Sequence, residues 1–432
     1  MTIAETNPTA APSDDGAGRG EFTGETGSLF NIMFKGLLLT ILTLGIYRFW
    51  MKTHLRRYYW GSTRLDGEPL EYTGKGVELL LGFLIAIFFL AIYLAVVNFG
   101  LSFASMAYWQ GYEPAAFLSL LTLLPLIPYA KYRAQRYLLS RTRWKGVRFG
   151  LDLEAWAYTW RSLLWSLGSI VTLGLLYPLA DFKLRQFITK RMTFGDQRFE
   201  LTGKAGGLYR GFIWVWALIA ATVAVFVAVA VTATPPPAND PFATPEPSGP
   251  LIALGLFVYL AAIIGFIWYG SFRLKYILSR MEVASHGGAP AQIISEMQPG
   301  RMTMVVIGGL FLTMLITIAF AVGMALVFGV AGAGVAAAYP ELLSVFDPSL
   351  NQGDPDPATL VVIFGAVIVF YLIIGVAAVI AAEIFVNRRY IDRAIGTLRI
   401  QNVAAMSSAR QQAQTEEQAA EGFADALDVG AF

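Results

Sequence analysis

The sequence predicts an all-α polytopic membrane protein with six transmembrane helices in three hairpins, two re-entrant or additional membrane helices, and small cytoplasmic β-hairpins. Hydrophobic residues make up 56% of the 432 residues and charged residues only 14%, whereas a soluble domain has about 25% charged residues. Six apolar runs are long enough to cross about 30 Å of hydrocarbon, which needs roughly 20 residues. The basic residues are gathered at one end of these runs, as in multi-pass membrane proteins.

The six runs pair into three hairpins through loops without lysine or arginine. The runs are 77–106, 116–136, 207–232, 251–272, 303–331 and 359–386, and the loops are 107–115, 232–250 and 332–358. Basic residues accumulate in cytoplasmic loops. We therefore predict a protein of the bacterial inner membrane, with these loops in the periplasm and both termini in the cytoplasm.

Two further apolar runs, 29–50 and 160–180, are interrupted by a Thr-Leu-Gly sequence. The interrupting residues are Thr43, Leu44 and Gly45 in the first run and Thr172, Leu173 and Gly174 in the second. Glycine permits a reversal of the chain, and threonine can satisfy a freed backbone group. Basic residues also flank the second run on both sides. We therefore favour re-entrant elements that bend at the glycines; the alternative is two ordinary crossings and eight spans.

An internal duplication relates these two interrupted runs. With a shift of 129 residues, 43–82 aligns without a gap to 172–211, and eleven of 40 positions are identical. A repeat of this kind indicates a duplicated structural unit. The predicted organisation is a disordered tail (1–21), a first membrane repeat unit (22–141), a second repeat unit (142–280), a C-terminal transmembrane hairpin unit (281–400) and a second disordered tail (401–432).

A shorter signature recurs five times, in which a basic stretch leads to an aromatic residue that opens an amphipathic segment. The aromatic residues are Tyr58, Tyr137, Phe187, Tyr276 and Tyr390. The chain becomes strand-like after three of these copies, with turns at Asp66-Gly67, Lys145-Gly146 and Gly195-Asp196. Asp-Gly between β-forming residues is a strong hairpin signal. We expect three short hairpins that form a small cytoplasmic cap.

Seven polar residues are candidates for contacts with a ligand or a lipid headgroup: Lys35, Arg56, Glu71, Lys75, Arg185, Glu200 and Lys204. Six of them form pairs that are equivalent by the 129-residue shift. Glu71 and Glu200 either meet as two carboxylates or pair with Arg56 and Arg185. Lys75 and Lys204 either occupy interfacial turns or contact headgroups. Lys35 lies in an apolar run, where a lysine is a functional candidate unless it snorkels.

Several classes of chemistry have no basis in this sequence. The chain has no cysteine and two histidines, which excludes disulfides and thiolate ligands and disfavours a metal site. No nucleophile elbow, kinase set or metalloprotease motif is present. We therefore expect no catalytic residue, no metal, no cofactor and no enzymatic activity. The basic clusters adjoin the apolar runs, so their expected partner is the lipid bilayer with its anionic phospholipid headgroups, and not nucleic acid.

The stretch from Phe22 through LLLTILTLGIYRFW, LRRYYWGSTRLDG and EPLEYTGKGVELLLG closely resembles the YjgN family of bacterial inner-membrane proteins, a domain of unknown function. The resemblance covers most of 22–400 and is densest in 22–82. It implies a multi-pass inner-membrane protein and brings no catalytic residues. Lys35 stands where the resemblance leads us to expect a neutral polar residue, so no shared polar role is inferred there.

Two functional hypotheses follow. The first is transport, or channel-like handling of a small molecule or lipid, through the duplicated broken-helix units, because transporters build midplane sites from half-helix ends. The second is a non-transporting membrane organiser or sensor that binds anionic lipid and a cytoplasmic partner. A polar cavity near Gly45 and Gly174 would favour the first, whereas apolar surroundings at these glycines would favour the second.

Overall fold

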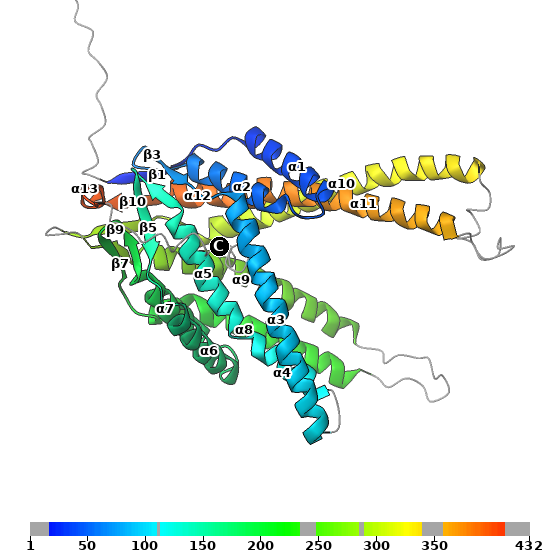
Figure 1. Cartoon of the computed structure of the whole chain (residues 1–432), viewed down its shortest axis with the longest axis horizontal. Coiled ribbons are helices and arrows are strands. Elements are labelled where there is room, and N and C mark those ends of the chain that lie inside the picture. The colour runs from blue at the N-terminus through cyan, green and yellow to red at the C-terminus, as the bar shows by residue number, and fades with distance from the viewer. Residues whose placement is uncertain (1–16, 110–112, 234–247, 285–288, 339–356, 411–432) are drawn as a thin grey trace, which may run out of the picture.

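The computed structural model describes residues 17–109, 113–233, 248–284, 289–338 and 357–410. Helical hairpins radiate from a small β-barrel at one end of the molecule (Figure 1). Strands from the whole length of the chain therefore gather in one place, and every described hairpin begins and ends at that barrel. The middles of the three loops without basic residues lie outside the described residues.

Ten short strands close into an antiparallel barrel in the order β1-β10-β9-β8-β7-β6-β5-β4-β3-β2. The strands are β1 (Gly18–Phe22), β2 (Thr63–Leu65), β3 (Glu68–Tyr72), β4 (Thr142–Trp144), β5 (Val147–Leu151), β6 (Met192–Phe194), β7 (Gln197–Leu201), β8 (Met281–Val283), β9 (Ala291–Ser295) and β10 (Leu398–Gln401). The ring closes where Gly18 of β1 pairs with Ile400 of β10. Closure leaves no unpaired strand edge.

Helical segments occupy the connections between the odd-numbered and the even-numbered strands. They are α1 (Thr26–Leu42), α2 (Arg48–Ser62), α3 (Gly76–Trp109), α4 (Glu113–Leu123), α5 (Leu126–Ser140), α6 (Ala155–Val171), α7 (Tyr177–Thr189), α8 (Gly206–Thr232), α9 (Gly249–Leu278), α10 (Pro299–Ala338), α11 (Pro357–Ala382), the π-helix η3 (Glu383–Arg388) and α12 (Arg389–Gly396). A last short helix, α13 (Val403–Ser407), follows β10.

The described chain is built from five copies of one unit, namely strand, helical hairpin, strand. In every copy the residue after the odd-numbered strand donates its backbone N–H to the carbonyl of the residue directly before the even-numbered strand. The five bonds are Thr23 to Ser62 (2.8 Å), Thr73 to Arg141 (2.9 Å), Asp152 to Arg191 (3.2 Å), Thr202 to Arg280 (2.9 Å) and Glu296 to Thr397 (2.9 Å). These bonds tie the base of each hairpin to the barrel, and the five aromatic signatures mark the five returning helices.

The three predicted β-hairpins are confirmed. Asp66 and Gly67 have φ of 55° and 76°, and Lys145 and Gly146 have φ of 49° and 77°, the positive values that a type I′ hairpin turn requires at both central residues. The prediction of separate small hairpins was incomplete, however, because β1, β8, β9 and β10 join the three hairpins in one closed barrel.

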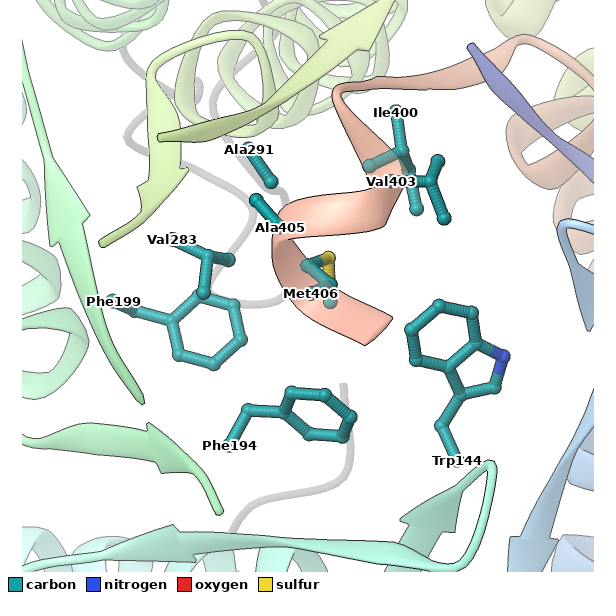
Figure 2. Packing of buried hydrophobic residues seen from close by; sticks show 9 residues of the cluster. All are labelled: Trp144, Phe194, Phe199, Val283, Ala291, Ile400, Val403, Ala405 and Met406. Atoms are coloured by element: carbon teal, nitrogen blue, oxygen red, sulfur yellow. The ribbon is translucent and has the colours of Figure 1, made fainter. Parts of the chain in front are cut away.

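The barrel is filled by its own side chains and by α13. Trp144, Phe194, Phe199 and Val283 point inward and meet Val403, Ala405 and Met406 of the helix and its start (Figure 2). Gln197 donates from Nε2 to the Ala405 carbonyl at 2.6 Å. The predicted tails therefore need correction at their inner ends, since residues 18–21 lie in β1 and residues 401–407 lie in β10 and α13.

Five helical segments of the described residues are long and apolar enough to cross a membrane, not six. They are Gly76–Tyr108, Gly206–Thr232, Gly249–Leu278, Pro299–Val330 and Phe364–Gly396. The expected span 116–136 is interrupted near Pro125 and forms α4 and α5, of 11 and 15 residues. Proline lacks the N–H that a continuous helix needs and clashes with the preceding turn.

The runs 29–50 and 160–180 do not form continuous helices. Helix α1 ends at Leu42 and α6 ends at Val171. After each of these ends the chain reverses into a second short helix. The predicted bends at Gly45 and Gly174 are confirmed. A helix of 17 residues is roughly 25 Å long, less than the hydrocarbon thickness of about 30 Å, so α1 and α6 suit hairpins that enter a bilayer without crossing it.

The duplication is visible in the order of elements. Both copies contain a short helix, a Thr-Leu-Gly turn, a second short helix, a β-hairpin and a long apolar helix. The five-unit architecture explains the shift of 129 residues, because it moves the first unit onto the third and the second onto the fourth. We expect the two copies to superpose about an axis near the membrane normal.

Candidate functional site at the junction of barrel and membrane helices

Tyrosine hydroxyls join the two ends of the helical hairpins at the barrel. Tyr58 donates to the Glu25 carbonyl at 2.9 Å, Tyr137 to Oε2 of Glu78 at 2.9 Å, and Tyr276 to the Lys204 carbonyl at 2.6 Å. In each case the tyrosine lies on the returning helix and its acceptor lies at or just before the start of the outgoing helix. The aromatic signature thus fixes the spacing of the hairpin at its base.

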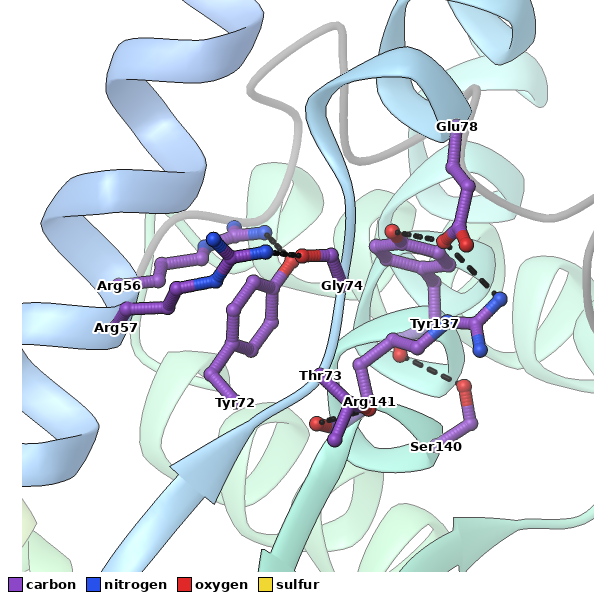
Figure 3. Close-up of polar contacts among 9 residues, drawn as sticks. All are labelled: Arg56, Arg57, Tyr72, Thr73, Gly74, Glu78, Tyr137, Ser140 and Arg141. Atoms are coloured by element: carbon purple, nitrogen blue, oxygen red, sulfur yellow. Dashed lines mark hydrogen bonds and ion pairs between the residues drawn. The ribbon is translucent and has the colours of Figure 1, made fainter.

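Arginines lie four residues after Tyr137, Phe187 and Tyr276 and stack on these rings. The Arg141 guanidinium lies 5.6 Å from the centre of the Tyr137 ring and 3.0 Å from Oε2 of Glu78, and Figure 3 shows these three groups together. In the third unit a phenylalanine replaces the tyrosine, and Arg191 stacks on Phe187 at 3.6 Å. Stacked arginine–aromatic pairs of this kind stabilise by about 0.5 to 2 kcal/mol.

Arg56 lies within this junction and not at an ion pair with Glu71. Its guanidinium is buried, donates to the Tyr72 hydroxyl at 3.3 Å and lies 5.6 Å from the Tyr72 ring centre (Figure 3). The neighbouring Arg57 donates to the Gly74 carbonyl at 3.0 Å. In the other repeat, the residue equivalent to Arg56 is Arg185, which pairs with Asp181 at 3.1 Å. Both arginines therefore position helices at the barrel.

The two predicted carboxylates lie on strands of the barrel and do not bond to those arginines. Glu71 on β3 is opposite Arg143 on β4, and Glu200 on β7 is opposite Glu282 on β8. Both glutamates are exposed. The described contacts support neither alternative left open by the sequence. Among these contacts, the glutamates form no ion pairs with Arg56 and Arg185, and they do not form a shared acid–base site.

The lysines of the Thr-Gly-Lys sequences lie at the starts of two long apolar segments. Lys75 directly precedes α3, and Lys204 lies two residues before α8; both side chains are exposed. Two residues before each lysine, Thr73 or Thr202 donates from Oγ1 to the carbonyl of Arg141 or Arg280, respectively, at 3.1 Å. This places two equivalent ammonium groups at the level where the apolar helices begin, which is where lipid headgroups are expected. Lys35 is exposed near the middle of α1.

The Thr-Leu-Gly turns are Schellman helix ends. The amide of Gly45 donates to the Thr40 carbonyl at 2.7 Å and the amide of Leu44 to the Ile41 carbonyl at 3.1 Å, and the second copy repeats both bonds with Gly174 and Leu173. Thr43 accepts the amide of Tyr47 at 2.9 Å, and Thr172 accepts that of Leu176 at 3.2 Å, as predicted for a capping threonine.

An unusual feature of these turns is their leucine. Leu44 and Leu173 both have φ of 50°, in the left-handed region where a Schellman end normally has glycine. Their side chains are 95% and 81% exposed. The strain at each leucine costs roughly 1 to 2 kcal/mol, so the turns keep an exposed apolar side chain at the tip against the local backbone preference.

Sequence reasoning missed a half-buried contact between the first and last units. Tyr59 on α2 donates to Oε1 of Glu383 at 2.5 Å, and Asn387 donates to Oε2 of the same carboxylate at 2.7 Å. Glu383 begins the π-helix η3, a distortion that is frequent at functional sites. Only the glutamate near the end of an apolar run could have signalled this contact.

Two clefts between α10 and α12 were also missed. The larger, of about 780 Å³, is lined by Glu296, Gln298, Arg301, Met302, Asp392, Arg393, Gly396 and Thr397. The smaller, of about 240 Å³, is lined by Met304, Val305, Gly308, Gly309, Arg389 and Arg393. Both clefts are lined by Arg393, so they join into one groove at the base of the fifth hairpin. The larger cleft is its polar end and the smaller cleft is its apolar end.

Long apolar hairpins rooted in one barrel define a multi-pass membrane protein. The chain belongs to the DUF898 family, described as bacterial protein of unknown function, whose family model matches residues 17–426. This family match, together with similarity to a YjgN protein, confirms the resemblance to the YjgN family.

The inner membrane protein YjgN of Salmonella typhimurium (strain LT2) is 28% identical to this chain over 140 residues. The match covers 32% of this chain and 33% of that protein, so it spans about a third of the relative's length. No solved structure matches the chain.

Proposed function

We propose that the chain is a non-transporting, non-enzymatic organiser of the bacterial inner membrane. In this proposal the hairpins anchor the protein in the bilayer, and the barrel lies against the cytoplasmic surface, where it gathers anionic lipid and presents a partner surface. The main support is the exposure of the spans. In each of the five candidate spans only 6% to 11% of the most apolar window is buried within the chain, which suits helices surrounded by lipid more than helices that enclose a pathway.

The placement at the inner membrane follows from the name of the Salmonella relative and from the segregation of basic residues. Exposed cations such as Lys75 and Lys204 lie at the barrel ends of the spans. The cytoplasmic leaflet is anionic, and each basic residue near it contributes about 1 kcal/mol to attraction. The barrel side is therefore assigned to the cytoplasm.

A transporter with a midplane site would need polar surroundings at the helix breaks. A Cβ built on Gly45 would meet nothing within 4 Å, and one on Gly174 would approach only the indole of Trp216 at 3.9 Å. The adjacent Leu44 and Leu173 are exposed, and neither groove cleft includes these residues. The breaks therefore favour apolar hairpin tips over half-helices around a substrate.

The proposal is tested by reconstitution of the full chain into vesicles that contain fluorescent phosphatidylglycerol. We expect ion and metabolite flux equal to that of protein-free vesicles, together with self-quenching of the labelled lipid as the protein gathers it. The variant K75Q/K204Q should reduce this self-quenching, whereas R64Q, an exposed arginine on β2, should not. Saturable, protein-dependent flux, or unchanged lipid mixing, would overturn the organiser hypothesis.

A further inference from the structure

The groove between α10 and α12 lies beside a close contact of two backbones. A Cβ on Gly309 would lie 2.4 Å from the Phe385 carbonyl oxygen, so α10 and η3 are in direct backbone contact at this level. One residue earlier, a Cβ on Gly308 would meet nothing within 4 Å. Helix α10 therefore contacts η3 through Gly309, whereas Gly308, about 100° around the helix, borders the open side of the groove.

The groove has a cationic end and an apolar end. Arg301 and Arg393 make no hydrogen bond or ion pair with any residue that the structure describes, and Arg389 stacks on the Phe385 ring at 5.1 Å. Of the two lining carboxylates, Glu296 is already paired with Arg399 at 3.0 Å. Three guanidinium groups thus face a single acidic group, Asp392, that makes no ion pair with another described residue.

The apolar end continues onto the lipid-facing surface of α10. Met304 is 71% exposed, and Leu310 and Phe311 beyond it are 50% and 57% exposed. Arg301 is the third residue of the candidate span Pro299–Val330, and Arg393 is three residues from the end of Phe364–Gly396. The cations therefore lie at headgroup level and the apolar lining at the level of the first acyl carbons.

We propose that this groove binds one anionic phospholipid, with its phosphate between Arg301 and Arg393 and an acyl chain over Met304 and Gly308. Guanidinium groups bind phosphate oxygens through two parallel N–H bonds, and basic pockets between transmembrane helices on the cytoplasmic side suit anionic headgroups. The start of α10 adds the positive end of a long helix dipole. This inference rests on the proposed position of the barrel at the bilayer surface and names the lipid that it holds there.

The test is native mass spectrometry of the full chain in detergent, titrated with phosphatidylglycerol or phosphatidylcholine. We expect one tightly retained phosphatidylglycerol, and R301Q/R393Q should weaken its retention at least tenfold. The control R64Q/K190Q removes two exposed cations near the barrel that the proposed gathering of lipid does not use, and it should change retention less than twofold. Equal loss in both double variants would show surface attraction and overturn the site.

The apolar end is tested by Gly308→Leu, with Gly323→Leu as its control. A Cβ at either glycine meets open space, so both variants should fold with unchanged thermal unfolding, but only Gly308→Leu fills the groove and should reduce lipid retention at least tenfold. Millimolar glycerol phosphate should not displace the lipid; if it does, the groove binds a free phosphate ester and the lipid assignment is wrong. Solute flux would refute the organiser function and leave these binding results intact, so the two failures are distinguishable.

Discussion

At the scale of the residue, the signature tyrosines Tyr58, Tyr137 and Tyr276 join the two helices of their own hairpins, whereas the Tyr390 hydroxyl lies 3.4 Å from that of Ser271 on α9. The acceptor differs from one copy to the next: it is a backbone carbonyl for Tyr58 and Tyr276 and a carboxylate for Tyr137. Notably, Phe187 keeps the ring and the stacked arginine without a hydroxyl. The shared requirement is therefore an aromatic ring at the helix end, and the hydroxyl adds a bond wherever a nearby acceptor allows it.

Replacement of Tyr137 by phenylalanine should lower the free energy of unfolding by about 1.5 to 3 kcal/mol, because it removes a hydrogen bond to a charged group. Unfolding in mixed detergent micelles measures this loss. Tyr371→Phe is the control, since Tyr371 is 68% exposed, and it should change the stability by less than about 0.5 kcal/mol. Equal effects of the two variants would mean that the Tyr137–Glu78 bond does not stabilise the hairpin base.

Tyr59 should make the free energy of unfolding depend on pH. Burial, and then the neighbouring Glu383 carboxylate, raise the pKa of Tyr59 above its ordinary value, which is about 10. The folded state therefore keeps the phenol protonated after the unfolded chain has lost that proton, so stability is constant in this respect below pH of about 10 and declines above it. Tyr59→Phe should reduce the decline by about 1.4 kcal/mol per pH unit. An unchanged slope in an unfolding series from pH 9 to 11 would contradict the assignment.

At the scale of the element, the short hairpins are defined by their turns. Each turn combines a Schellman end, a threonine that accepts the amide of the residue before the returning helix, and a leucine and a glycine with positive φ. The glycine supplies conformational freedom, whereas the leucine is strained and exposed at the tip. The proposed contact of the tips with hydrocarbon would favour an apolar residue at that position in both copies.

A comparison of two glycines tests the turn. Gly174 has φ of 87°, so Gly174→Ala should lower the free energy of unfolding by about 1 kcal/mol or more. Gly168 lies within α6, where alanine is favoured over glycine by about 1 kcal/mol, so Gly168→Ala should be neutral or stabilising. Chemical denaturation of both variants measures the difference; a stabilising Gly174→Ala would contradict the left-handed turn.

At the scale of the whole molecule, the barrel organises the membrane segments. All ten strands belong to one ring, so every described hairpin begins and ends at the barrel. With the barrel on one side of the bilayer, as proposed, each hairpin would cross the bilayer an even number of times or not at all. The lumen is closed by α13, which buries Val403, Ala405 and Met406. Helix α13, near the end of the described residues, therefore completes the core of the barrel.

Truncation of the plug should destabilise the barrel as a core substitution does. Met406→Ala removes a side chain that is 3% exposed and should cost about 2 to 5 kcal/mol of unfolding free energy. Met314→Ala, at a half-exposed site on α10, should cost far less under the same conditions. If both substitutions have the same effect, α13 is not part of the folded core.

The sequence predicted those features that have local signals. Two-residue turns such as Asp66-Gly67 revealed three hairpins, and the Thr-Leu-Gly breaks revealed the bends. The β8–β9 connection was missed because Ala284–Pro290 is longer than a hairpin turn, and the interruption at Pro125 was read through as one apolar run. Closure by β1 and β10 has no local signal, since its partners Gly18 and Ile400 lie at opposite ends of the chain. The groove was missed for the same reason, because Arg301 and Arg393 meet only in the fold.

The central claim is that the barrel lies on one side of the bilayer and the short hairpins enter the membrane without crossing it. Because the native chain has no cysteine, single cysteines at Leu44, Leu173, Lys190 and Ser248 can be labelled with a membrane-impermeant maleimide from either side of oriented inner-membrane vesicles. We predict labelling of Lys190→Cys only from the cytoplasmic side, of Ser248→Cys only from the periplasmic side, and of Leu44→Cys and Leu173→Cys from neither. Labelling of either leucine position from the periplasmic side, or of Lys190→Cys from the same side as Ser248→Cys, would contradict the account.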